Sequence, residues 1–195
     1  MDRNKNDLKR EYIDVGIKAF GDENEGKYEL SFSSEDPYRR WFGTEILDHK
    51  DGAINLKRLN SIGCLLFNHN RDSVIGRIEK AWLEDGKGKA IVLFDSDEDA
   101  VKIKNKVDSK TLKGVSVAYS VEVWETVKEG SKSADGRFNG PCEIARKWTP
   151  HEISIVSVPA DPTVGVGREK AANSENLSIY ARLISVNKNY LEGTE

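Results

Sequence analysis

The sequence predicts a mostly β or α+β fold, with a closed or partly open antiparallel β-barrel as its core and a few helices around it. Period-two alternation recurs along the chain, turn residues separate the alternating stretches, and helical spacing is confined to one or two stretches. With 195 residues, 37% of them hydrophobic, the chain suits one sizeable core and is short for two domains. We expect one domain over residues 1–167, its barrel over about 12–162, and a helical tail over 168–195.

The first 60 residues predict a hairpin followed by an irregular segment. Residues 12–20 alternate weakly and residues 28–32 alternate cleanly, with a turn-rich link between them, which is typical of paired strands. Residues 38–51 have no clear period, and four apolar residues are expected to anchor them: Trp41, Phe42, Ile46 and Leu47. One or two helical turns are expected over residues 54–59.

The middle of the chain predicts three strands and one helix. Residues 64–67 are a short continuous apolar run, which is typical of a strand buried on both faces. Residues 75–83 and 90–94 predict a hairpin closed by the loop 84–88. Acidic residues at 95–99 favour the positive end of a helix dipole, so a helix is expected from there to about residue 114.

The strongest strand prediction covers residues 115–124. One face carries only apolar residues: Val115, Val117, Tyr119, Val121 and Val123. The other face begins with small residues: Ser116, Ala118 and Ser120. Residues 128–140 are rich in glycine, serine and charge, and they predict a mobile loop.

Two further strands are predicted before the polar C-terminal region. Residues 143–148 form one, and residues 152–158 alternate as the second. Pro150 and Pro159 bracket the second strand, and each removes a backbone donor that a sheet would use. The tail then carries an apolar stripe at helical spacing, which either docks and regulates access to a site or is a linker: Leu177, Tyr180, Ala181 and Ile184.

The composition argues against nucleic-acid and membrane partners. The formal net charge is −3 and basic residues form no long run, whereas a nucleic-acid binder usually shows a basic face. No apolar run approaches the roughly 18 residues of a membrane span, and the first residues do not resemble a signal peptide. We therefore expect neither partner, and we expect Cys64 and Cys142 to be reduced.

Three side chains form a candidate catalytic constellation. His69 follows the apolar run at 64–67, Ser116 lies on the small-residue face of the strongest strand, and Glu152 lies on the polar face of the last. Acyl transfer needs a hydroxyl nucleophile, an imidazole that takes its proton, and a group that orients the imidazole. Side chains on one face of neighbouring strands, which lie about 4.8 Å apart, can meet. The pattern names the residues and leaves the strand pairing open.

Other interpretations use the same residues. Glu152 can form an ordinary ion pair with Arg146 or Lys147. The histidines and cysteines can be combined into a zinc site, although no pair has spacing typical of zinc ligands: His49, His69, His151, Cys64 and Cys142. We therefore expect no metal and no cofactor, and residue patterns alone establish only a β-rich domain.

Three motifs resemble those of the phage prohead proteases of the HK97 type, and they occur in the family's order. Residues 66–70 (LFNHN), followed by 75–78 (IGRI), are similar to the family's histidine motif. Residues 113–119 (KGVSVAY) are similar to its nucleophile motif, and residues 151–162 (HEISIVSVPADP) to its third and most specific motif. The resemblance runs from about residue 28 to about residue 167.

The resemblance implies roles for the site residues. The family is similar in fold to the herpesvirus assemblins, serine proteases with a β-barrel core and a Ser-His-His site. His151 and Glu152 both stand where the second histidine would be. The strand fits best when Glu152 takes that place, and alternation then sends His151 to the opposite face. The implied triad is Ser116, His69 and Glu152, with His151 as the alternative third member and the backbone N–H of Ala160 as the oxyanion donor.

The resemblance also implies a function. Such a chain is a serine endopeptidase of a tailed phage, packaged inside the prohead in the host cytoplasm, and it can form a homodimer or higher oligomer. It matures the capsid during virion assembly by cleaving a scaffold protein or the scaffolding segment of the major capsid protein precursor, and it cleaves itself.

Two other classes stay open. One is a catalytically silent assembly or scaffold module of the same fold, against which the intact Ser116, His69 and Glu152 argue. The other is a scaffold-like structural protein fused to a protease ancestor. For that class we expect a long helical extension, and the residues after Gly167 are too few to form one.

Overall fold

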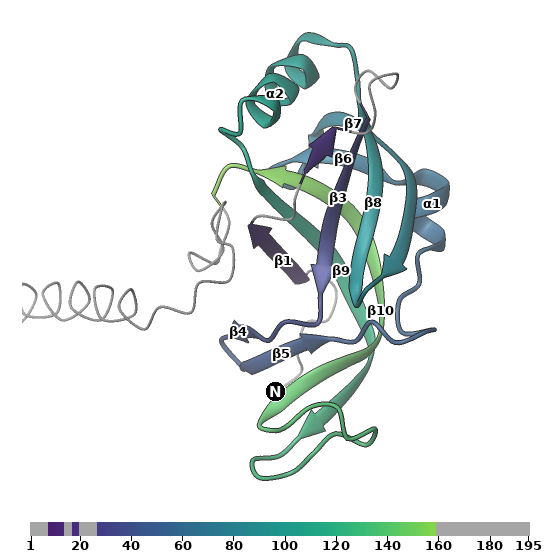
Figure 1. Cartoon of the computed structure of the whole chain (residues 1–195), viewed down its shortest axis with the longest axis vertical. Helices are drawn as coiled ribbons and strands as arrows, with labels where there is room; N and C mark the ends of the chain where they lie inside the picture. Colours follow the sequence, from purple (N-terminus) through teal and green to yellow (C-terminus); the bar gives the residue numbers. More distant parts are fainter. Residues whose placement is uncertain (1–7, 14–16, 20–26, 159–195) are drawn as a thin grey trace, which may run out of the picture.

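The computed structural model describes residues 8–13, 17–19 and 27–158 (Figure 1). In chain order these residues form β1 (Leu8–Ile13), β2 (Lys18–Ala19), β3 (Lys27–Ser34), β4 (Tyr38–Arg40), β5 (Gly43–Leu47), α1 (Lys57–Ile62), β6 (Cys64–Phe67), β7 (Asn70–Glu84), β8 (Lys87–Phe94), α2 (Glu98–Asp108), β9 (Gly114–Val127) and β10 (Cys142–Val156). The predicted helical tail over 168–195 lies outside the described residues.

These strands form one curved sheet that is mixed rather than antiparallel (Figure 1). Its order is β1-β9-β10-β6-β7-β8-β3-β2, with β5 beside β10 and β4 beside β5. Both β5 and β6 run parallel to β10, and the other neighbours are antiparallel. The mostly β prediction is confirmed. The predicted closed or partly open antiparallel β-barrel is not supported, because the sheet is mixed and among the described residues β1 and β2 end it without pairing with each other.

The parallel pairs exist because the chain from β5 to β6 follows one edge of β10 instead of turning back. β5 pairs with the first part of β10, Ile54 forms a parallel bridge with Trp148, and β6 pairs with the last part. Helix α1 lies on the path between them. Residues alternate with period two in both kinds of sheet, so the sequence pattern carried no information on strand direction.

The N-terminal strand pairs differently from the prediction. A hairpin between residues 12–20 and 28–32 was expected, but only Lys18–Ala19 of β2 pair with β3. The strand β1 pairs instead with β9, antiparallel along its whole length. This pairing places β1 at one end of the sheet, directly beside the predicted nucleophile strand.

The second hairpin and the long helix lie close to their predicted positions. β7 and β8 are joined by Asp85 and Gly86, with φ of 52° and 68°, as a two-residue hairpin turn requires. The carboxylate of Asp97 accepts hydrogen bonds from the first N–H groups of α2. The helix ends at Asp108, earlier than expected. No helix in the described part of the chain is long and apolar enough to cross a membrane.

The hydrophobic core unites side chains from most strands with α1 and α2. Its largest fully buried apolar members are Trp148, Tyr119, Phe32, Leu30, Leu47, Leu59, Leu65, Ile75, Ile153 and Ile155. Of the predicted anchors between 38 and 51, Ile46 and Leu47 are buried, whereas the side chain of Trp41 is 80% exposed. Trp41 packs edge-on against Phe42 at the surface, so its prediction as a core anchor is wrong.

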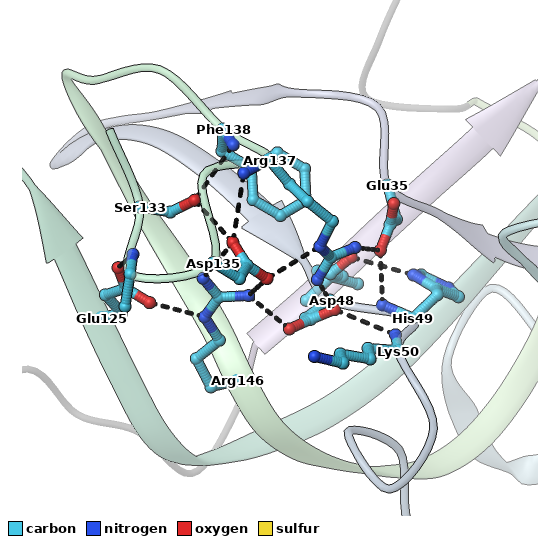
Figure 2. A network of polar contacts seen from close by, with 12 residues as sticks. Glu35, Asp48, His49, Lys50, Glu125, Ser133, Asp135, Arg137, Phe138 and Arg146 are labelled. Carbon is cyan, nitrogen blue, oxygen red and sulfur yellow. Dashed lines mark hydrogen bonds and ion pairs between the residues drawn. The ribbon is translucent and has the colours of Figure 1, made fainter. Parts of the chain in front are cut away.

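The loop between β9 and β10, predicted to be mobile, is held by an ion-pair network that we call the two-arginine network (Figure 2). Its centres are Arg137 in the loop and Arg146 in β10, and both contact Asp48 and Asp135 at 2.5–2.9 Å. Its remaining carboxylates are Glu35 and Glu125. Composition alone predicted mobility because it could not show carboxylates arriving from distant segments.

Candidate active site

His69 lies in a two-residue turn between β6 and β7. Asn68 and His69 both have positive φ, 52° and 58°, which is uncommon for residues other than glycine and fixes the turn type. The turn is bound to β10, because the N–H of Asn68 donates to Ile155 O and the N–H of His69 donates to Ser154 Oγ. These bonds hold the turn, and with it the imidazole of His69, against the last part of β10.

Ser116 lies on β9, the strand next to the end of the sheet. It is on β9 opposite Ser154 of β10 on one side and opposite Glu11 of β1 on the other. The Ser116 side chain is fully buried, at 0% exposure. The predicted small-residue face is therefore buried at Ser116 and Ala118.

The structure brings the three predicted side chains into one continuous contact. His69 Nε2 lies 2.6 Å from Ser116 Oγ, and His69 Nδ1 lies 2.5 Å from Glu152 Oε1. An ionised carboxylate only accepts, so it assigns the proton of the neutral ring to Nδ1. Nε2 is then left to accept the Ser116 proton, as a general base must.

A fourth residue, Ser154, completes this contact and was missed by the sequence analysis. Its hydroxyl donates to Glu152 Oε2 at 2.7 Å and accepts the His69 N–H at 3.1 Å. It is fully buried. The available signal was its position two residues after Glu152, on the same face of one strand.

A bulge decides how His151 and Glu152 are presented. β10 continues through Pro150, so the predicted strand boundary there is wrong. The register shifts between Pro150 and Glu152, which pair with Tyr119 and Ala118. This shift leaves His151 as the extra residue of a bulge. Alternation was expected to separate His151 from Glu152, but both line the cleft beside His69. Glu152 is the one that contacts the imidazole.

The cleft beside His69 is an open hollow of about 760 Å³. Its basic lining residues are Lys9, Arg58 and Arg71, contributed by β1, α1 and β7. Its size falls in the range of ordinary ligand clefts. Ala118 of β9 also lines the cleft, so the cleft reaches the strand that carries Ser116.

The competing interpretations of the same residues receive no support among the described residues. Arg146 pairs with carboxylates of the two-arginine network rather than with Glu152. The described residues contain no group of three or more His, Cys, Asp or Glu side chains that could hold a metal ion. Cys64 is exposed and Cys142 is buried, and both are free thiols. The oxyanion candidate Ala160 lies outside the described residues.

His49 belongs to a different polar pair. Its Nε2 lies 2.7 Å from Ser33 Oγ, and its Nδ1 lies 2.9 Å from the carbonyl oxygen of Leu47. Burial lowers the pKa of His49, and the hydrogen bond to the Leu47 carbonyl and the charge of Glu35 oppose this effect only in part. The sequence analysis considered His49 as a zinc ligand and did not predict this contact.

Comparison with known proteins agrees with the motifs. Residues 28–177 match the family described as caudovirus prohead serine protease. Over 154 residues the chain is 38% identical to the major capsid protein of Halomonas phage phiHAP-1, a match that covers 77% of this chain. The chain spans about a quarter (24%) of that relative's length. No solved structure matches.

Proposed function

The chain belongs to the caudovirus prohead serine protease family, and from that membership we propose that it is a serine endopeptidase that matures a phage prohead. The observation that carries the proposal is the continuous contact from Ser116 through His69 to Glu152, at 2.6 and 2.5 Å. These are the three groups that acyl transfer needs, in the order in which it needs them.

In the proposed mechanism, His69 Nε2 removes the Ser116 proton while Oγ bonds to the scissile carbonyl carbon. The carbonyl oxygen takes up the negative charge, and we propose the backbone N–H of Ala160 as a donor to it. Glu152 stabilises the imidazolium, which protonates the leaving amine as the C–N bond breaks. Water deprotonated by His69 then hydrolyses the acyl-enzyme on Ser116 and releases the new carboxyl terminus.

We propose that the substrate is the major capsid protein precursor or a scaffold protein, and that the chain also cleaves itself. The support is the family and the relative from Halomonas phage phiHAP-1, which is named as a major capsid protein. The proposal places the enzyme inside the prohead, in the host cytoplasm, where it associates with copies of itself. Confinement with the substrate would supply the high local concentration that an intramolecular or densely packed reaction uses.

A second candidate is a catalytically silent assembly module of the same fold. The observation that favours it is the complete burial of Ser116, which no substrate carbonyl reaches while β1 stays in place. The two candidates differ in whether Ser116 is ever a nucleophile.

The test incubates the purified chain with the capsid precursor and follows cleavage by mass spectrometry, with and without a fluorophosphonate that reacts with activated serines. We expect new termini in the precursor, a phosphonate adduct on Ser116, and loss of cleavage after treatment. Cleavage that continues in the treated sample without an adduct would contradict the proposed nucleophile. An intact precursor together with unmodified Ser116 would favour the silent module.

A further inference from the structure

The strand β1 occupies the edge of β9 beside the nucleophile. The two strands are antiparallel, with Glu11 opposite Ser116 and Arg10 opposite Val117. β1 ends the sheet, so its removal would turn β9 into an exposed edge over residues 114–119. An exposed strand edge binds extended peptides through main-chain hydrogen bonds, in the mode known as β-augmentation.

The backbone of β1 competes with His69 for the Ser116 proton. Ser116 Oγ lies 3.1 Å from the carbonyl oxygen of Arg10 and 2.6 Å from His69 Nε2. A hydroxyl has one proton, so a bond donated to the carbonyl withholds it from the imidazole. The oxygen of the Arg10 carbonyl faces Oγ, whereas attack requires the carbon to face Oγ and the oxygen to face N–H donors. β1 therefore lies beside Ser116 as a blocking strand and not as a reacting one.

The Arg10 side chain is buried on the face of the sheet opposite to the Ser116 side chain, because Arg10 pairs with Val117. It is 1% exposed, it donates a hydrogen bond to the carbonyl oxygen of Asp36, and its guanidinium lies 5.2 Å from the centroid of the Tyr38 ring. A carbonyl acceptor and an aromatic face are the partners that a guanidinium or ammonium prefers. The fold thus holds a basic side chain at the residue whose carbonyl meets Ser116.

We infer that the β9 edge over residues 114–119 is the peptide-binding site and that β1 is its internal competitor. A substrate enters as an extended strand in place of β1, antiparallel to β9. A lysine or arginine occupies the position of Arg10, and the peptide bond after it lies beside Ser116, turned from the β1 orientation so that its carbonyl carbon faces Oγ. This inference deepens the proposed function and rests on Ser116 being the nucleophile. It adds that the chain as folded here is self-blocked and that the site selects a basic residue.

The first test releases β1 in the full chain by Arg10→Ala, with Arg77→Ala as the matched control. Arg77 lies on β7 with its side chain 60% exposed, and it is not among the residues that line the cleft. We expect Arg10→Ala to raise the rate of fluorophosphonate labelling of Ser116 by about 10- to 100-fold, the equivalent of losing one charged hydrogen bond. The control should keep the wild-type rate. Equal labelling of all three proteins would contradict the block.

The second test locks β1 reversibly and stays informative if Arg10→Ala does not fold. Lys9 and Ala118 are directly opposite across β1 and β9, so Lys9→Cys with Ala118→Cys can form a disulfide in a Cys64→Ser background. The oxidised protein should not be labelled at Ser116, and reduction of the same sample should restore labelling. Labelling that does not depend on oxidation would overturn the inference.

The third test measures the side-chain preference with peptides that carry lysine, arginine, glutamine or glutamate before the scissile bond. We expect kcat/KM to be at least about tenfold higher for the two basic peptides, since a buried acidic group would lose its partners. No preference would contradict the role of the Arg10 position. If Ser116 is never labelled, even in reduced or Arg10→Ala protein, the proposed protease function itself fails. If it is labelled equally everywhere, only the inference fails.

Discussion

Two serine–histidine contacts in the described part of the chain have nearly equal length but different surroundings. Ser116 Oγ lies 2.6 Å from His69 Nε2, and Ser33 Oγ lies 2.7 Å from His49 Nε2. Both histidines use the second ring nitrogen for another bond. For His69 that partner is the carboxylate of Glu152, and for His49 it is the carbonyl oxygen of Leu47.

The third partner separates the two pairs. A carbonyl fixes the tautomer of an imidazole but carries no charge to stabilise the imidazolium that forms when a serine is deprotonated. Burial also lowers the pKa of His49, which makes it a poorer base than an ordinary histidine. A short distance between serine and histidine is therefore insufficient. The charge of the orienting group decides whether the pair can act as nucleophile and base.

The largest expected effect on the rate of hydrolysis comes from replacing Ser116, and the same change at Ser33 is its matched control. Ser116→Ala should reduce peptide hydrolysis by about 10⁴- to 10⁶-fold, because loss of a triad member removes the nucleophile itself. Ser33→Ala removes the same atom from the other pair and should leave kcat within about twofold, at a cost of about 1 kcal/mol in stability. Initial rates and chemical denaturation measure both. A Ser116→Ala enzyme with more than a tenth of the wild-type rate would move the nucleophile elsewhere, with Ser120 as the first residue to test.

The next effect tests the charge of the orienting group. Glu152→Gln should lower kcat/KM by about 10²- to 10⁴-fold, because an amide can stabilise the wrong tautomer and cannot stabilise the imidazolium. His151→Ala, at the neighbouring position of the bulge, should cost less than about tenfold. The reverse ranking of the two variants would assign the third role to His151 and make the site a Ser-His-His arrangement.

A smaller effect is expected at Ser154, which positions Glu152 and the His69 turn. Ser154→Ala should reduce kcat by about 10- to 100-fold with KM little changed, because misplacement of a catalytic group costs rate more than binding. Loss of a hydrogen bond to the carboxylate leaves more negative charge facing the imidazole, so the acidic limb of the pH–rate profile should move to higher pH. Ser154→Thr keeps the hydroxyl and should restore both. An unchanged pH profile would mean that Ser154 only packs.

The contact among His69, Ser116 and Glu152 could be predicted from sequence better than the architecture around it, and their catalytic roles stay predictions. His69, Ser116 and Glu152 each lie in or beside a strand with a clear pattern, and motif order linked them. The pairing of β1 with β9 joins residues more than 100 positions apart. No local sequence pattern can predict a pairing over that distance. The bulge at His151 also escaped prediction, because alternation assumes an unbroken register.

Strand direction and charge pairing were hidden for a related reason. The parallel course of β5 and β6 along β10 could not be predicted, because residues alternate with period two in parallel and antiparallel pairs alike. The loop at 128–140 was predicted from its composition to be mobile, yet Arg137 in that loop contacts Asp48, 89 residues earlier. Ala160 and residues 168–195 lie outside the described residues, so the roles proposed for them stay predictions.

The smallest expected effect concerns the pH dependence of stability at His49. Its folded-state pKa is lowered, chiefly by burial, so the unfolded chain binds a proton there more readily than the folded one. Stability from this group is complete above the ordinary histidine pKa and is lost as the pH falls through it toward the folded value. The slope from one such group is at most about 1.4 kcal/mol per pH unit.

The charged groups around His49 sharpen this prediction. Glu35 and Asp48 raise its pKa, whereas Arg10 lowers it. Burial raises the pKa of Asp48, but hydrogen bonds from Arg146 and Arg137 outweigh this and hold it below its usual value, so Asp48 stays ionised between pH 7 and 5. We therefore expect the wild-type protein to lose stability as the pH falls from 7 to 5. The His49→Gln variant, whose amide does not titrate, should be less stable at pH 7.5, but its stability should change less over the same interval. Urea denaturation at several pH values measures the free energy of unfolding of both proteins. Parallel curves of this free energy against pH would show that His49 is protonated to the same extent in the folded and unfolded states, and would contradict the prediction.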